Sequence, residues 1–449
     1  MRRSQVVALA TTVALLLGLP GCALVKPRRV AVVERVTIRK TLAPGERVPA
    51  AGDGAAGGST GSALNALGPS RDRQVSSDGD GGIAAGSIKI GTINIVEGAL
   101  RDIGLPIVKT TQAYIEDINA RGGINGRRLE LVSYSACETC ADQALAAATR
   151  LVERDHVFAL VNTFSLSYAF EPVIPYLEKH GVPLIQGMSQ SQLEPLGPMN
   201  YFFATHLGKG ERLYAQWLAK IIGERGIAKK VAIGYMNNPQ AKRKKDGVRA
   251  SLARRGIDVV DEELIEENED AVTHMDAAVS RMRMSGATAV FLASNVLLPF
   301  AAQAAKRQGW SPVWVANADW AQLAIDSCGG ACEGAYSDTS GWAFPDTKTA
   351  QMARFKRVMA AYYPSGKIEA LTVGAGTGMV VFEDLMRRMG STPTRAGLLE
   401  HLEGLRGYET GLTPPITVNA GDHWGISGAQ MLQVRGGKWV RVTDWLLMD

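Results

Sequence analysis

Short apolar runs and amphipathic stretches alternate along this chain from residue 88 onward. Apolar runs of four to eight residues predict strands, and apolar residues spaced three or four apart predict helices. In the first half the expected strands are Ile88–Ile95, Leu129–Ser133, Ala159–Asn162 and Leu184–Gln186, and the expected helices are Ile107–Arg121, Ala141–Arg154 and Phe170–His180. This strand–helix–strand order predicts a parallel sheet with helices on both faces.

The same alternation begins again after Gly208. Here the expected strands are Val231–Tyr235, Val259–Leu264, Ala289–Ala293 and Val313–Ala316, and the expected helices are Glu211–Arg225, Gly247–Arg255, Ala271–Met284 and Pro299–Gln308. Two similar halves predict an α/β protein with two doubly wound parallel-sheet lobes.

The C-terminal part follows a different pattern. Helices are expected at Thr347–Tyr363, Glu369–Met389 and Thr394–Leu405, with little strand between them. Alternating runs at Met431–Arg435 and Lys438–Asp444 flank Gly436-Gly437, which predicts a β-hairpin.

The N-terminus has the pattern of an export signal. Arg2 and Arg3 precede an apolar run, Val6–Leu19, that is shorter than the roughly 20 residues of a membrane-spanning helix. The run ends in Leu19-Pro20-Gly21-Cys22, which is similar to a bacterial lipobox. Residues 1–21 are therefore expected to be a signal peptide, with a lipid on the sulfur of Cys22. The alternative is a plain secretory signal with an incidental cysteine.

Residues 22–86 are interpreted as a tether to the membrane. Positions 50–86 contain ten glycines and almost no large apolar side chains, a composition that does not support a packed core. A flexible chain of about 37 residues would span on the order of 30 to 37 Å.

Length and charge limit the classes of function. The 363 residues after Gly86 are enough for two lobes. Residues 1–86 hold 11 Lys and Arg against 6 Asp and Glu, whereas the rest of the chain holds 38 of each sign. A charge-balanced domain is not expected to bind nucleic acid. The basic run Lys242-Arg243-Lys244-Lys245 is then interpreted as a solvated helix start.

Four cysteines remain besides Cys22, in two short-range pairs. They are Cys137 with Cys140 and Cys328 with Cys332. Outside the cytoplasm such pairs are expected to form small-loop disulfides. A shared zinc site and, for the first pair, a redox role are the alternatives.

Signatures of catalysis are missing from the sequence. It has no G-x-S-x-G elbow, no H-E-x-x-H and no phosphate-binding G-x-x-x-x-G-K-[ST] loop, and its six histidines stand singly. The run Gly374-Ala375-Gly376-Thr377-Gly378 lacks a preceding strand, so it is interpreted as small residues for close helix packing rather than as a nucleotide loop. No enzyme activity, metal or cofactor is expected.

A family resemblance rests on residues 87–192. The strand IKIGTINI, the helix end Asp117-Ile118-Asn119-Ala120-Arg121-Gly122-Gly123, the strand LELVSY and the segment LEKHGVPLIQGMSQS resemble the type I periplasmic solute-binding proteins. Within these, the likeness is to the leucine/isoleucine/valine-binding group of ABC-importer receptors. The resemblance extends over nearly all of the chain after residue 87.

The resemblance implies a hinge of three chain crossings between the lobes. The crossings are expected near Thr205–Gly208, Tyr336–Gly341 and Gly411–Pro415. Residues 87–206 and 338–411 would then form the first lobe, and residues 207–337 and 412–449 the second.

Candidate ligand-binding residues follow the strands of the first lobe. In two-lobe α/β proteins, ligands bind outside the carboxyl ends of the strands. The turns Thr163–Ser167 and Gly187–Ser191 stand there, and in the family they hold the ligand's carboxylate and ammonium groups. The resemblance assigns this role to Ser165, Ser167, Ser189 and Ser191, with helix N-capping as the alternative. Arg101, expected in the loop after the first strand, is a further candidate.

The second lobe departs from the family pattern. Asn237-Asn238-Pro239-Gln240 replaces the usual aromatic–glycine pair, which counts against an amino-acid ligand. Asp319 stands near the family's ammonium-binding acid, although an Asp at a helix start is also a common cap. Asn238, Asn295 and Asp319 are the candidates of this lobe.

Together these patterns predict an extracytoplasmic, lipid-anchored solute-binding protein. It would capture a small polar ligand, an amino acid or a related compound, by hinge closure. As a monomer it would deliver this solute to the permease subunits of an ABC importer. A sensory or regulatory receptor with the same fold is the first alternative, to be separated by whether permease and ATPase genes are adjacent. An exported hydrolase is the second, and it needs a serine paired with a base.

Overall fold

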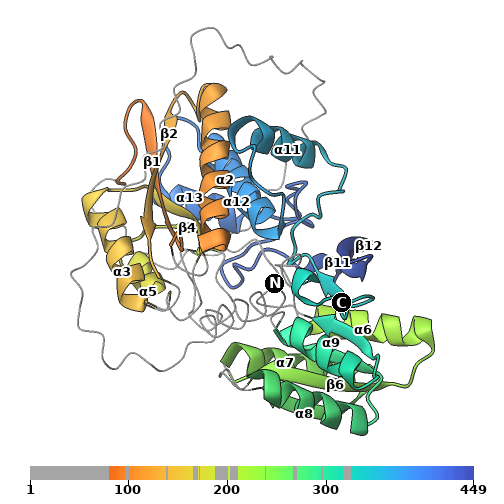
Figure 1. Cartoon of the computed structure of the whole chain (residues 1–449). Coiled ribbons are helices and arrows are strands. Elements are labelled where there is room, and N and C mark those ends of the chain that lie inside the picture. The colour runs from red at the N-terminus through yellow and green to blue at the C-terminus, as the bar shows by residue number, and fades with distance from the viewer. Residues whose placement is uncertain are drawn as a thin grey trace.

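The computed structural model describes residues 80–97, 101–137, 140–164, 170, 172–187, 201–202, 211–237, 239–265, 271–294, 297–316 and 325–448. In this part of the chain, the first lobe contains a parallel sheet with the strand order β2-β1-β3-β4-β5 (Figure 1). Its strands are β1 (Ser87–Asn94), β2 (Arg128–Ser135), β3 (Ala159–Thr163), β4 (Leu184–Gly187) and β5 (Tyr201–Phe202).

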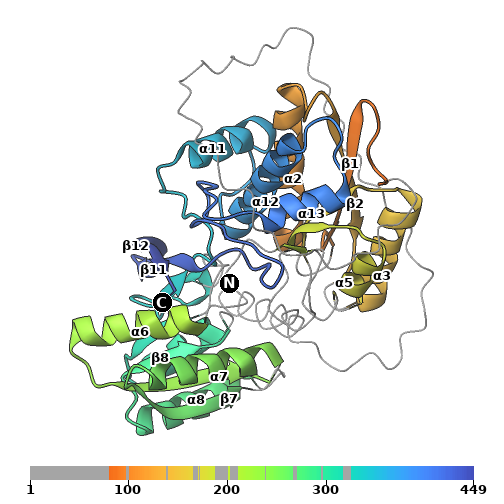
Figure 2. The same cartoon turned by 180° about the vertical axis from the view of Figure 1, so that it is seen from behind.

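Helices cover both faces of this sheet. One face packs against α2 (Arg101–Ala120), α11 (Ala350–Tyr362), α12 (Ala370–Arg388) and α13 (Arg395–Glu403). The other face packs against α3 (Ala141–Thr149) and α5 (Val173–Lys179), and α3 continues into a π-helical turn at Arg150–Arg154. Figure 2 shows α12 and α13, which come late in the sequence, beside the early strands of the first lobe.

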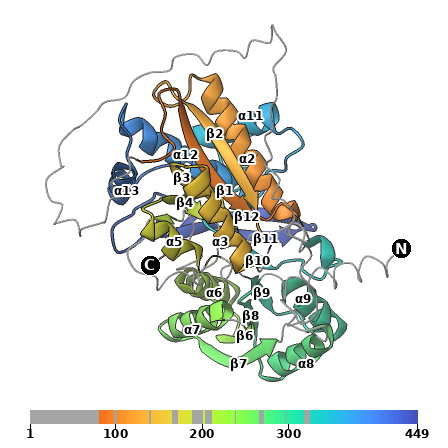
Figure 3. The same ribbon diagram turned by 90° about the vertical axis from the view of Figure 1, so that its left-hand side faces the viewer.

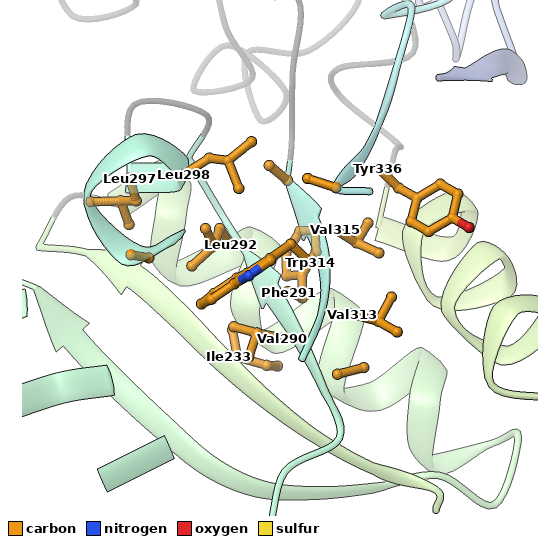
Figure 4. Close-up of a cluster of buried hydrophobic side chains, with 14 of the residues drawn as sticks. Ile233, Val290, Phe291, Leu292, Leu297, Leu298, Val313, Trp314, Val315 and Tyr336 are labelled. Atoms are coloured by element: carbon orange, nitrogen blue, oxygen red, sulfur yellow. The ribbon is translucent and has the colours of Figure 1, made fainter. Parts of the chain in front are cut away.

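The second lobe contains a mixed sheet with the order β12-β11-β10-β9-β8-β6-β7. The parallel strands are β6 (Lys230–Met236), β7 (Asp258–Ile265), β8 (Ala289–Leu292), β9 (Val313–Ala316) and β10 (Tyr336–Asp338). The helices are α6 (Glu211–Arg225), α7 (Pro239–Ala253), α8 (Ala271–Met284) and α9 (Leu298–Arg307). Figure 4 shows part of its core, with side chains from β6, β8 and β9 including Ile233, Phe291 and Trp314.

A C-terminal hairpin completes the second sheet at its edge. Strands β11 (Gly428–Arg435) and β12 (Lys438–Leu447) pair antiparallel around Gly436 and Gly437, whose φ values are 59° and 71°. Two successive residues with positive φ are what a two-residue hairpin turn requires. In Figure 3 the hairpin lies between the first lobe and the rest of the second.

Two of the three expected crossings lie within the described residues, and they run side by side. Ala343 donates to the Leu412 carbonyl (2.7 Å), and the Thr349 hydroxyl donates to the Gly411 carbonyl (2.7 Å). Positive φ values at Ser340 (55°), Gly341 (90°) and Gly411 (71°) mark sharp bends at these crossings. The first crossing, expected near 205–208, lies outside the described residues.

The predicted fold class is confirmed. The molecule is an α/β protein with two doubly wound sheets, each with the flavodoxin-like order in which the first strand lies between the second and the third. The glycine run of α12 is also confirmed as packing surface. A β-carbon added at Gly374 would lie 2.8 Å from the Trp342 ring, and one at Gly376 would lie 2.7 Å from the Phe355 ring.

The packed chain begins before the boundary expected at residue 87. Asp80 accepts a hydrogen bond from the backbone N–H of Arg395 at the start of α13 (2.8 Å). The Arg395 guanidinium in turn donates to the carbonyls of Val157 and Phe158 (2.8 and 2.9 Å). Residues 80–86, which the composition assigned to the tether, therefore contact the first lobe beside the amino ends of its strands.

The interpretation of the basic run as a solvated helix start is wrong for two of its lysines. Helix α7 begins at Pro239, eight residues before the expected start, so Lys244 falls on the buried side of the helix with Ala241 and Val248 and is 2% exposed. Lys245 is bonded to Glu262 (2.9 Å). Hydrogen bonding to this carboxylate raises the pKa of Lys245.

Both expected disulfides are present. They join Cys137 to Cys140 and Cys328 to Cys332, with Cα atoms 5.3 and 5.7 Å apart. Each closes a short loop within one lobe, which excludes a zinc site shared by the two pairs.

A cluster of charges ties three helices of the first lobe together. Glu383 of α12, whose side chain is 5% exposed, accepts hydrogen bonds from Arg121, Arg354 and Arg387 at 2.8 to 3.2 Å. Arg354 of α11 also bonds Asp117 of α2 (2.8 Å). Burial alone would raise the pKa of Glu383, but the charges and hydrogen bonds of the arginines hold it below its usual value.

Candidate functional site

Most candidate ligand-binding residues lie outside the described residues. This holds for Ser165, Ser167, Ser189, Ser191, Asn238, Asn295 and Asp319, and for the lipidation candidate Cys22. The strands that lead into these positions are described, and their ends locate the candidate site.

In the first lobe the two serine-bearing turns start side by side. Strands β3 and β4 are parallel neighbours, and Thr163 is paired in register with Gly187. The chain leaves both strands at the same edge of the sheet, toward residues 163–167 and 187–191. The structure thus brings together the starting points of the two turns that the sequence singled out.

The second lobe repeats this arrangement. Gly234 of β6 pairs with Leu292 of β8, and Leu292 pairs with Ala316 of β9. The segments carrying Asn238, Asn295 and Asp319 therefore leave three neighbouring strands at one edge. In each lobe, the point where the strand order reverses lies between the first and third strands, where α/β sheets bind ligands.

Polar side chains at the carboxyl ends of β1 and β3 are joined by hydrogen bonds. Thr92 and Asn94 of β1 both donate to the Asn162 carbonyl, at 3.0 and 3.1 Å. The Asn162 amide donates to the Thr111 hydroxyl of α2 (2.8 Å) and to the Ala375 carbonyl of α12 (2.9 Å). All four side chains are fully buried, so these bonds fix the strand ends against both helices.

In the described part of the chain, three buried side-chain oxygens at this edge have no hydrogen-bond partner. They are Oδ1 of Asn94, Oδ1 of Asn162 and Oγ1 of Thr163, on residues 0%, 0% and 1% exposed. An amide oxygen accepts hydrogen bonds, and a hydroxyl can donate to an anion or accept from a cation. These atoms are thus chemically suited to a polar ligand or a bound water.

A small apolar cluster lies directly after the end of β3. Phe164 is 4% exposed and packs with Ile95, Ile107 and Ala375 in a small cluster of its own. Its backbone N–H donates to the Ile93 carbonyl (2.9 Å). Phe164, the residue directly before Ser165, is therefore held by both packing and a backbone hydrogen bond.

The location expected for Arg101 is wrong. Arg101 is the first residue of α2 and is exposed, rather than lying in a loop. The helix was expected from Ile107, but it begins six residues earlier and contains Pro106, which removes a backbone hydrogen bond without ending the helix. Gly104 lets this first turn lie against Ile95, because a β-carbon there would overlap the Ile95 backbone.

Sequence reasoning missed Asn94, Asn162, Thr163 and Gln186. A signal was present, because three strands of the first sheet carry polar residues near the ends that lead to this edge, as in IGTIN, ALVNT and PLIQ. A polar residue at the end of a buried strand needs a partner, and for the Asn162 amide the partners come from α2 and α12.

The described residues contain no helix long and apolar enough to span a bilayer. Within that same part of the chain, no group of three or more His, Cys, Asp or Glu side chains could hold a metal ion.

Comparison with known proteins supplies the family. The sequence model described as "Periplasmic binding protein" matches residues 87–438. This chain belongs to the periplasmic binding protein family. Family members are solute-binding proteins, and the type I fold of the leucine/isoleucine/valine-binding group predicted from residues 87–192 is confirmed.

Individual relatives agree with this assignment. An amino acid binding protein of Pseudomonas aeruginosa is 29% identical over 211 residues, which are 46% of this chain and 54% of that protein. The match thus spans about half the length of this relative.

Two solved structures share the fold. A leucine binding protein of Thermotoga maritima has 18% identity and a TM-score of 0.65, covering 79% of this chain and 97% of its own. A branched chain amino acid ABC transporter protein of Thermus thermophilus with bound valine has 17% identity and a TM-score of 0.65, covering 81% and 97%.

Proposed function

We propose that this protein is an extracytoplasmic, lipid-anchored receptor that captures an amino acid or a related small polar compound and delivers it to an ABC importer. The observation that carries the proposal is the paired arrangement of strand ends. In each lobe, polar segments follow neighbouring parallel strands that end at the same edge of the sheet, and this is the edge where α/β sheets bind ligands. The names of the Pseudomonas and Thermus relatives support an amino-acid ligand.

The ligand would be held from both lobes. In the first lobe, the hydroxyls of Ser165, Ser167, Ser189 and Ser191 would bind its anionic group. In the second, Asp319 would meet a cationic group, with Asn238 and Asn295 as hydrogen-bonding residues. Arg101, at the exposed start of α2, is a further candidate for an anionic group.

Closure of the two lobes over the ligand would follow if each lobe supplies some of the ligand contacts. A ligand that touches both lobes favours the closed form by the contacts that the open form lacks. The bends at Ser340, Gly341 and Gly411 are the described positions at which the backbone could absorb the rotation. The importer would then recognise the closed form.

Substitution of the cleft residues tests the proposal. Losing a charge-assisted hydrogen bond costs about 1.5 to 3 kcal/mol, or roughly 10- to 150-fold in Kd. We expect Ser189→Ala with Ser191→Ala, and separately Asp319→Asn, to weaken binding of the preferred amino acid by about this factor in calorimetry. The melting temperature without ligand should change little. Unchanged affinity in both variants would place the binding site elsewhere.

A sensory receptor of the same fold remains the second candidate, because the site would be identical. The two are separated by transport. Deleting the gene should abolish uptake of the bound compound if the protein serves an importer, and should leave uptake intact if it only reports the compound.

A further inference from the structure

Two fully buried polar residues near strand ends of the first lobe have an unusual backbone conformation. Asn162 and Gln186 have φ values of 52° and 59°, in the left-handed region that non-glycine residues seldom adopt. Each is the next-to-last residue of its strand, β3 or β4, and each is 0% exposed. The chain therefore bends at the same level in both strands, one residue before each serine-bearing turn.

One glycine of α12 lies against both bends. A β-carbon added at Gly378 would overlap Oδ1 of Asn162 and would lie 2.7 Å from Cβ of Gln186. Real β-carbons do not come so close to other heavy atoms, so a larger residue would push the helix and the strand ends apart. Only glycine allows α12 to approach both strands at this level.

Hydrogen bonds hold Asn162 in place from the other sides. Its side chain bonds Thr111 of α2 and the Ala375 carbonyl of α12, and its carbonyl accepts from Thr92 and Asn94 of β1. A single residue thus links β1, β3, α2 and α12 at the point where the chain turns toward Ser165. These bonds offset the strain of the left-handed conformation.

We propose that Gly378 and Asn162 are positioning residues of the ligand site. Gly378 lets α12 pack against the two bends, and Asn162 is hydrogen-bonded to both helices, so the ends of β3 and β4 at Thr163 and Gly187 are held in one arrangement. As far as ligand binding is concerned, this inference rests on the proposed function. Gly374 of α12 lies against Trp342, which directly follows the second crossing, so the same helix contacts this crossing and the ends of β3 and β4.

Hydrogen exchange of the ligand-free full chain tests the inference without requiring a ligand. We expect Gly378→Ala to accelerate amide exchange in peptides covering 158–164 and 182–187 by about 3- to 10-fold, the equivalent of one lost hydrogen bond. Asn162→Gly keeps the left-handed backbone accessible but removes both side-chain bonds. Asn162→Gly should accelerate amide exchange in the peptide covering 158–164. This variant provides the test if Gly378→Ala does not fold.

Two glycines provide matched controls. Gly374→Ala introduces a smaller overlap on the same helix, 2.8 Å at its closest, against Trp342 rather than the strand ends. Gly223→Ala on α6 introduces none, because nothing lies within 4 Å of the added carbon. Neither control should accelerate the two strand-end peptides. Equal acceleration by Gly374→Ala, or unchanged exchange in Gly378→Ala, would overturn the inference.

Calorimetry with L-valine, and with the other amino acids if valine does not bind, separates this inference from the proposed function. If the wild-type protein binds, Gly378→Ala and Asn162→Gly should weaken binding at least about 10-fold, whereas Gly374→Ala should not. If no amino acid binds the wild type but the exchange pattern holds, the positioning role stands and the proposed function fails. Acceleration of the peptides with unchanged affinity would contradict a role in the site.

Discussion

Buried polar residues, rather than apolar ones, distinguish the edge of the first sheet at which the candidate site lies. Thr92, Asn94 and Asn162 end strands that are otherwise apolar, and their hydrogen bonds fix the strand ends to two helices. Such a network specifies one arrangement only if its members find partners. The same reasoning applies to Glu383, the other buried polar centre of this lobe.

Removing the Glu383 carboxylate should destabilise the protein strongly. Glu383→Gln leaves Arg354, 19% exposed, with fewer counter-charges, and breaking a buried ion pair from one side typically costs about 3 to 5 kcal/mol. Asp276→Asn is the control, because it breaks an exposed pair with Arg307 and should cost under about 1 kcal/mol. Urea unfolding at neutral pH measures both, and equal losses would refute the special role of Glu383.

The same variant should change the pH dependence of stability. The pKa of Glu383 is lowered in the folded protein from a usual value of 4.5, so its contribution is fully present above that pH and is lost as the pH falls through the folded pKa. The difference in stability between wild type and Glu383→Gln should therefore shrink below about pH 4.5. A constant difference from pH 7 to pH 3 would contradict this.

At the scale of elements, the Cys328–Cys332 bond should stabilise the second lobe modestly. Both cysteines are 1% exposed, and the closed loop is short. Loop-closure entropy gives about 2 kcal/mol for a loop of this size. We expect the double variant Cys328→Ala/Cys332→Ala to lose about this much in chemical unfolding and to retain its fold. Free thiols in non-reduced wild-type protein would show that the bond does not form.

The sequence predicted the elements whose patterns are strong and missed the starts of those whose patterns are weak. Strands β8 and β9 and helix α8 were found nearly residue for residue, because each is a clear apolar or amphipathic run. Helix α7 was recognised only from Gly247 onward, because the basic run before it has no apolar period. In this first part of α7 the buried side of the helix carries Lys244, and a charged residue at a buried position is not revealed by a hydrophobic pattern.

The candidate site was predictable only at the level of strand ends. Alternation along the chain indicates which segments follow parallel strands, and the topology then brings them to one edge. The bends at Asn162 and Gln186 could not be predicted, because they depend on the approach of α12, more than 180 residues away in sequence. Tertiary contacts of this kind leave no local signal.

At the scale of the whole molecule, Asp80 lies at the edge of the first sheet opposite the candidate site. It contacts the start of α13, and residues 156–158 before β3 lie beside it, whereas Thr163 and Gly187 are at the carboxyl ends of β3 and β4. The proposed tether would therefore attach away from the ligand site and leave it accessible to solute and importer.

Anchoring should depend on Cys22 alone. We expect the wild-type protein to partition into detergent and Cys22→Ala to be released or left unprocessed, because a lipid chain on this sulfur would be the attachment. Ligand affinity of the released protein should equal that of wild type. Wild-type protein found wholly in the culture medium with an unmodified Cys22 would refute the anchor.

The most direct test of the account is thermal unfolding of ligand-stripped protein against a panel of amino acids and related small compounds. A ligand present at 100 times its Kd stabilises the folded protein by about 2.7 kcal/mol, which shifts the melting temperature by several degrees. The account predicts that a chemically related group of compounds with a carboxylate produces such a shift, and that Ser189→Ala with Ser191→Ala diminishes it. If no compound of the panel shifts the melting temperature, and no small molecule accompanies the protein before stripping, the account of an amino-acid receptor is contradicted.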